Sequence, residues 1–139
     1  MQIVFDPSTV RQSKIGSITG VVYFDFDSGR GFPGVGWNDF VVVILNWWIA
    51  ALQKILQGEK AELRFMDGPY WISVVPQGPT ILLQCTEDRD GAGVLYEVDV
   101  GIESFKRELL SFARRLWNAY RQANIQASEL DEIKKYLPN

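Results

Sequence analysis

The amino-acid sequence predicts an α+β protein in which an antiparallel β-sheet of about five to six strands carries its helices on one face. Two patterns support this fold class. Apolar residues alternate with polar ones in several short runs, as in half-buried strands, and recur at helical spacing in longer runs. The connections between residues 61 and 100 are too short for parallel crossovers, so we expect the strands there to be antiparallel neighbours.

The first part of the chain predicts two strands and a loop. Ile3-Val4-Phe5 is the apolar part of the first strand, and it is too short and too weakly charged at its start for a signal peptide. Residues 18–27 alternate, with Ile18, Val22, Phe24 and Phe26 on the buried face. The Gly- and Pro-rich residues 28–36 then form a loop.

A central helix is predicted over residues 39–57. We expect Asn38 to be its N-cap and Asp39 to lie in its first turn, near the positive end of the helix dipole. At 100° per residue, Trp48 falls in the middle of the apolar face and Trp47 at its boundary. Polar residues interrupt this helix, and it is shorter than the ~20 residues that a membrane span needs, so we expect a buried core helix and no membrane association.

After Gly58 the sequence predicts a meander of four strands and then two helices. In the fourth strand, Val94, Tyr96, Val98 and Val100 are expected to point inward. The four strands are predicted at residues 61–66, 70–75, 80–86 and 94–100, and the two helices at residues 103–123 and 128–137, the first ending near Asn124. The predicted order is therefore two strands, one helix, four strands and two helices.

Composition limits the possible functions. The 139 residues fit one domain, and we treat residues 1–139 as a single α+β domain. The chain has no His and one Cys, Cys85, so the usual zinc ligands and an intramolecular disulfide are excluded, and we expect no metal and a reducing, cytoplasmic location. Without His, a Ser or Cys nucleophile lacks its usual base. These features favour a non-catalytic protein.

Charge is unevenly distributed along the chain. The net charge is −3, but residues 1–100 carry seven Lys and Arg against twelve Asp and Glu, whereas residues 101–139 carry seven against five. An acidic chain is a poor candidate for nucleic-acid binding, because contacts with phosphates supply most non-specific affinity. We therefore expect no nucleic acid as a partner, and a basic protein as the complementary one.

Two loops resemble ligand motifs by their letters alone. Gly29 to Gly34 reads G-x-G-x-x-G, but Pro33 interrupts it and the helix begins only near Asn38, so no nucleotide cofactor is expected. Residues 87–91, with the later Glu97, overlay part of a calcium loop. However, the flanks are strands where that motif needs helices, and a solvated hairpin tip explains the charges more simply.

Candidate binding residues gather around the predicted hairpins. Tyr70 and Trp71 must point to opposite faces of their strand, which leaves one aromatic ring exposed beside Asp67. An acidic loop carries further candidates, and Trp47 is a candidate for contact between copies of the chain, including a homodimer. The full set of partner-binding candidates is Asp67, Tyr70, Trp71, Glu87, Asp88, Asp90 and Trp47.

The segments Trp37-Asn38-Asp39-Phe40, Trp47-Trp48 and Phe65-Met66-Asp67-Gly68-Pro69-Tyr70 carry a resemblance. Over roughly the middle half of the chain this W-x-D-F, W-W and F-M-D-G-P-Y pattern resembles a family of small uncharacterised bacterial proteins of similar length. In size, acidity and α+β layout the chain also resembles the bacterial immunity proteins, which neutralise toxins in the cytosol. That resemblance implies a protein partner, most concretely a basic toxin.

Three hypotheses about function therefore follow from the sequence. The first is a cytoplasmic protein-binding module of the immunity type. The second is a small carboxylate-based enzyme or ligand-binding domain centred on Asp39, Asp67 and the neighbouring aromatic residues. The third is a homo-oligomeric structural protein that uses exposed aromatic residues such as Trp47.

Overall fold

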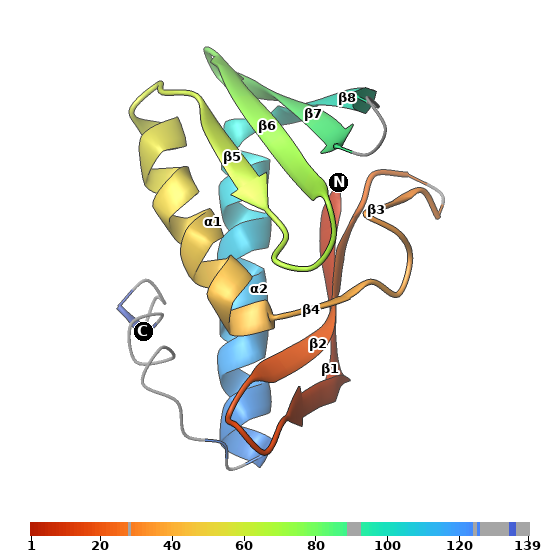
Figure 1. Ribbon diagram of the computed structural model, residues 1–139. Helices are drawn as coiled ribbons and strands as arrows, with labels where there is room; N and C mark the ends of the chain where they lie inside the picture. The colour runs from red at the N-terminus through yellow and green to blue at the C-terminus, as the bar shows by residue number, and fades with distance from the viewer. Residues whose placement is uncertain (28, 89–92, 124, 126–133, 136–139) are drawn as a thin grey trace.

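The computed structural model describes residues 1–27, 29–88, 93–123, 125, 134 and 135, which form two antiparallel sheets and two long helices (Figure 1). Sheet A contains β1 (Gln2–Gln12), β2 (Ile18–Asp25), β3 (Gly31–Phe32) and β4 (Asn38–Asp39). Sheet B is the meander β5 (Ala61–Arg64), β6 (Tyr70–Gln77), β7 (Thr80–Glu87) and β8 (Val94–Gly101). The helices are α1 (Val41–Leu56) and α2 (Ile102–Ala123).

The α+β class is confirmed, and the order of the predicted meander is correct. The strands nevertheless form two sheets of four instead of one sheet of five to six. The reason lies at β2, whose first edge pairs with β1. Its second edge is occupied by β3, through Phe24 opposite Phe32, and by β4, through Gly20 opposite Asp39. No edge of β2 is left for β5, so the meander forms a sheet of its own.

The start of α1 differs from the prediction. Asn38 and Asp39 pair with β2 as β4, so Asn38 is not the N-cap, and the cap position falls on Phe40, which provides no side-chain hydrogen bond. The helical phase is confirmed. Trp48 is fully buried, whereas Trp47 is 43% exposed.

A bulge corrects the predicted phase of β8. Cys85 pairs with Tyr96, but Thr86 pairs with Val94, so Leu95 is the extra residue. Val94 therefore leaves the inward set and is 48% exposed. Tyr96, Val98 and Val100 keep the predicted inward direction. Asn124 and the predicted last helix lie outside the described residues.

Trp48 lies where both sheets and both helices meet. Its ring is 5.2 Å from Phe24 of β2, 5.3 Å from Phe65 after β5 and 5.9 Å from Phe112 of α2. The buried apolar residues of all these elements form one connected core. Figure 1 shows α1 and α2 side by side, with sheet B across their upper ends and sheet A along α2. In the described part of the chain, neither helix has the length and apolar character of a membrane span.

Candidate binding surface

Asp39 is the most buried charged residue among those described, and its carboxylate is surrounded by N–H donors. Its Oδ2 accepts hydrogen bonds from the Trp37 indole at 2.9 Å and from the Asp67 backbone N–H at 3.3 Å. Its Oδ1 accepts from the backbone N–H groups of Phe40 at 2.6 Å and Met66 at 3.3 Å. The carboxylate is only 1% exposed and is satisfied on both oxygens.

This arrangement gives Asp39 a structural role. It joins the start of α1 to the turn between β5 and β6, two segments 27 to 28 residues apart. Asp67 takes part through its backbone, and its own side chain is exposed. The two aspartates that the enzyme hypothesis pairs are thus neighbours, but their contact is a backbone N–H to a carboxylate and not a pair of facing carboxyl groups.

Tyr70 and Trp71 point to opposite faces of β6, as predicted. The Tyr70 ring packs inward, 5.7 Å from Phe32 and 5.3 Å from Trp37. The Trp71 ring lies on the other face of sheet B, where the Arg64 guanidinium sits 5.4 Å from its centre. Trp71 is therefore the aromatic residue of the pair that is available on the outer surface of the sheet.

The outer face of sheet B is the set of outward side chains on β5 to β8. Inward residues such as Leu63, Ile72 and Leu83 are completely buried, whereas their outward neighbours are exposed or half-buried. The register aligns the outward residues in rows across the strands. The face consists of Glu62, Arg64, Trp71, Ser73, Val75, Leu82, Gln84, Glu97 and Asp99.

The Arg64 guanidinium that lies over Trp71 also contacts a carboxylate. Arg64 forms an ion pair with Glu62 at 2.7 Å, although both side chains remain about half exposed. The next row contains Ser73 and Gln84, and the Gln84 amide donates to Glu97 at 3.4 Å. The first row therefore places the Arg64 cation on the Trp71 indole ring. The adjacent row carries the hydrogen-bonding groups of Ser73 and Gln84, with carboxylates at both ends.

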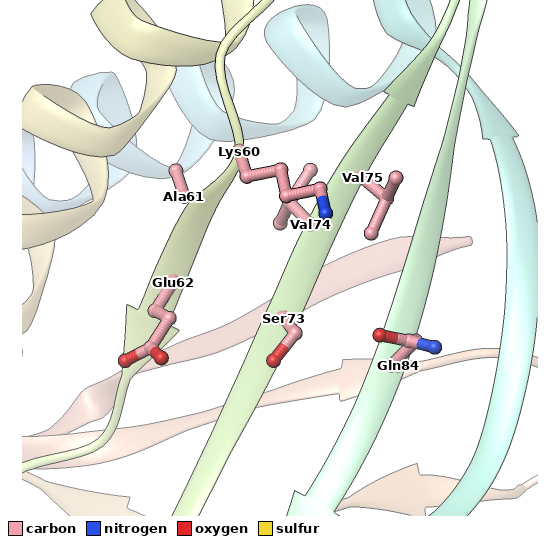
Figure 2. Close-up of a pocket in the computed structure, with 7 residues that line it drawn as sticks. All are labelled: Lys60, Ala61, Glu62, Ser73, Val74, Val75 and Gln84. Carbon is pink, nitrogen blue, oxygen red and sulfur yellow. The ribbon is translucent and has the colours of Figure 1, made fainter.

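A shallow hollow of about 340 Å³ lies beside this row. Figure 2 shows Glu62, Ser73 and Gln84 projecting from β5, β6 and β7 around it, with Lys60 just before β5 and Val75 at its edge. The hollow offers an ammonium, a carboxylate, a hydroxyl and an amide. These groups can both donate and accept hydrogen bonds.

Acidic residues collect at one end of sheet B. Glu87 pairs with Tyr70, and the Asp88 backbone N–H donates to the Pro69 carbonyl at 2.9 Å. The end of β7 therefore lies against the β5–β6 turn that carries Asp67. Of the predicted acidic candidates, the structure brings Glu87 and Asp88 to the same end as Asp67, while Asp90 falls outside the described residues.

Trp47 is exposed on α1, next to a residue that lines a second hollow. Val43, one helical turn before Trp47, lines a hollow of about 300 Å³ together with Ile15, Phe40 and Met66. Ile15 is 90% exposed and Met66 is 49% exposed. Sequence reasoning missed Ile15 and Met66 as site residues. For Ile15 the signal was a lone apolar residue in the polar turn between the first two strands.

Cys85 lies in β7 on the buried face of sheet B, where its thiol is shielded from solvent. Burial raises the pKa of its thiol from 9.0 to about 12, against a smaller opposing effect of Arg30. The pKa of Tyr96 also rises to about 12, mainly through burial and secondly through the neighbouring Cys85. The Arg30 guanidinium lies 4.8 Å from the centre of the Tyr96 ring. Near neutral pH Cys85 is a thiol and not the reactive thiolate.

Metal ligands do not gather in the described part of the chain: no three His, Cys, Asp or Glu side chains there lie close enough to hold an ion.

Comparison with family models, curated proteins and solved structures gives no match for the chain. The resemblance to small bacterial proteins and to immunity proteins therefore stays a prediction.

Proposed function

We propose that the protein is a non-catalytic protein-binding module whose contact surface is the outer face of sheet B. The partner is a basic protein, and in the most concrete form of the proposal it is a toxin that this chain neutralises in the cytoplasm. The observation that carries the proposal is the Arg64 guanidinium lying over Trp71 on an open sheet face with a carboxylate rim.

Residue types at this site are those that dominate protein interfaces. Trp and Arg are enriched among residues whose truncation costs 2 kcal/mol or more, at about the centre of an interface and inside a rim of polar contacts. Trp71 and Arg64 occupy one row of the outer face, and Ser73 and Gln84 provide hydrogen-bonding groups in the next. A partner that covers Trp71 also desolvates the Arg64 contact, which strengthens it.

Charge on the outer face indicates a basic partner. Glu97 and Asp99 add two carboxylates to the face and the charge of Glu62 is offset by Arg64, while Lys60 adds one ammonium at the hollow. Asp67 and Asp88 extend the acidic character to the end of the sheet. Complementary charge raises association rates and disfavours acidic proteins as partners.

Site-specific photo-crosslinking in the native host tests the proposal. A photoreactive amino acid placed at Ser73 or at Gln84 should crosslink to a basic protein, because both side chains lie on the outer face. The matched control is Ala50, which is exposed on α1. Crosslinking from Ala50 with none from Ser73 and Gln84, or an acidic crosslinked partner, would overturn the proposed surface.

The apolar hollow beside α1 supports a second candidate function, self-association. Ile15 and Met66 expose large apolar side chains around a hollow that Phe40 and Val43 also line, and the exposed Trp47 lies one helical turn after Val43 on α1. Exposed apolar patches of this kind mark interfaces. Sedimentation equilibrium should then show a dimer that Met66→Ser weakens, and a monomer at high protein concentration would exclude this candidate.

A further inference from the structure

Side chains contact backbone groups on the outer edges of two strands. At β1, the Ile3 backbone N–H donates to Glu108 at 2.9 Å, and the Ile3 carbonyl accepts from Arg115 at 2.8 Å. Both partners belong to α2. At β5, the Arg64 carbonyl accepts a hydrogen bond from the Trp48 indole at 2.8 Å. These contacts occupy backbone groups that would otherwise pair with another strand.

β8 differs from these strands. It is eight residues long and pairs with β7 on one side, and no described strand pairs with its other side. Its inward residues show the consequence. Tyr96 and Val98 are only half-buried, whereas their cross-strand partners Cys85 and Leu83 are completely buried. Tyr96 also packs against Phe26 and Phe32, with ring centres 5.8 and 6.0 Å apart, so the β2–β3 segment covers part of the inner side of β8 and leaves its edge half-buried.

The outward side chains of β8 set the charge of this edge. Glu97 and Asp99 both lie on the outer face, two residues apart. If two copies of β8 paired antiparallel around Val98, Glu97 of each would lie opposite Asp99 of the other. Like charges directly opposite each other destabilise a strand pair. In this register the outward side chains are thus unfavourable for a second copy and favourable for a basic strand, while the Arg30 guanidinium lies on the inner side, 4.8 Å from the centre of the Tyr96 ring.

We propose that β8 accepts an extended segment of a basic partner as a fifth strand of sheet B. Basic residues of that segment lie beside Glu97 and Asp99, and its alternate apolar residues lie beside Tyr96 and Val98. Backbone hydrogen bonds supply affinity and the alternating side chains supply selectivity, as in other cases of strand addition. The inference rests on the proposed function, because it specifies how the basic partner of sheet B binds.

A synthetic peptide tests strand addition directly. The probe is a capped peptide of about seven residues in which Lys and Val alternate, a typical strand length. Its binding is followed by fluorescence anisotropy, and backbone amide exchange of the protein is followed by NMR. The peptide should bind and slow amide exchange at every second residue of β8, since alternate N–H groups of an edge strand point away from its partner.

Two controls separate strand addition from simple charge attraction. A peptide with the same side chains but every interior amide N-methylated keeps its charge and loses its N–H donors, and should bind at least tenfold more weakly. The double variant Glu97→Lys/Asp99→Lys should instead prefer a Glu-Val peptide by at least tenfold.

Equal binding of the methylated peptide, or slowed exchange outside β8, would overturn strand addition. Absence of binding by the Lys-Val peptide would overturn it as well. Crosslinking from Ser73 and Gln84 reports on the outer face independently of β8, so strand addition can fail while the proposed function stands.

Discussion

Replacing Asp39 with Ala should destabilise the protein severely. The substitution removes the buried carboxylate that accepts four N–H groups, from Trp37, Phe40, Met66 and Asp67. Hydrogen bonds to charged groups contribute about 1.5–3 kcal/mol each. Counting only the two short bonds, at 2.9 and 2.6 Å, the loss is about 3–6 kcal/mol.

Urea denaturation measures this loss. With a slope of about 2 kcal/mol per molar urea, a loss of about 4 kcal/mol lowers the unfolding midpoint by about 2 M. Asp39→Asn keeps one carboxyl-derived oxygen but turns an NH₂ group toward N–H donors, so it should lose at least half as much. The matched control is Asp67→Ala, whose exposed side chain is expected to matter by less than about 0.5 kcal/mol.

A loss below about 1 kcal/mol for Asp39→Ala would refute the structural role, because the loss of two short hydrogen bonds to a buried carboxylate should cost more. Equal losses for Asp39→Ala and Asp67→Ala would also refute it. Either result would favour a catalytic or ligand-binding role for Asp39 over a structural one.

Three further predictions concern stability. Trp48→Ala should lower the free energy of unfolding by about 3–5 kcal/mol because Trp48 is fully buried, whereas Trp47→Ala should cost clearly less because Trp47 is 43% exposed. Urea denaturation of both variants checks this, and equal losses would contradict it. Burial raises the pKa values of Cys85 and Tyr96 to about 12, so the free energy of unfolding should have its full value below pH 9 and fall as pH rises from 9 to 12. Cys85→Ala should make this fall less steep, and an unchanged slope of the free energy against pH would contradict the prediction. Thermal melts with and without a chelator should coincide, since the chain lacks His and has one Cys; a drop of several degrees on chelation would contradict this.

The sequence was sufficient to predict the elements whose apolar residues recur with a clear strand or helix period. Alternation from Ile18 to Asp25 and helical spacing in α1 and α2 each bury one face, and this face determines the packing. The short connections of the meander determine its antiparallel order. Local patterns were enough for these elements but not for β8, where the bulge at Leu95 removes Val94 from the inward set.

The division into two sheets could not be predicted in the same way. β3 and β4 have two residues each, too few for any period, yet they occupy the edge of β2. The Asn38 N-cap prediction was wrong for the same reason, since pairing with Val21 holds Asn38 in an extended strand. Tertiary pairing here outweighs a local capping preference.

The candidate surface was predictable only in part. Opposite directions for Tyr70 and Trp71 follow from the strand period, but the sequence does not show that Phe32 and Trp37 cover Tyr70. The burial of Asp39 depends on donors 27 to 28 residues away. Contacts between distant segments carry no local signal, so the roles of these residues required the structure.

Binding kinetics of the crosslinked partner test the central claim most directly. Trp71→Ala should raise the dissociation rate at least about thirtyfold, which corresponds to about 2 kcal/mol, while Trp47→Ala should leave it nearly unchanged. Association should slow as salt rises from about 50 to 500 mM, because the screening length falls from roughly 14 to 4 Å. A large effect of Trp47→Ala with none from Trp71→Ala, or an association rate independent of salt, would contradict the assignment of the outer face of sheet B as the binding surface.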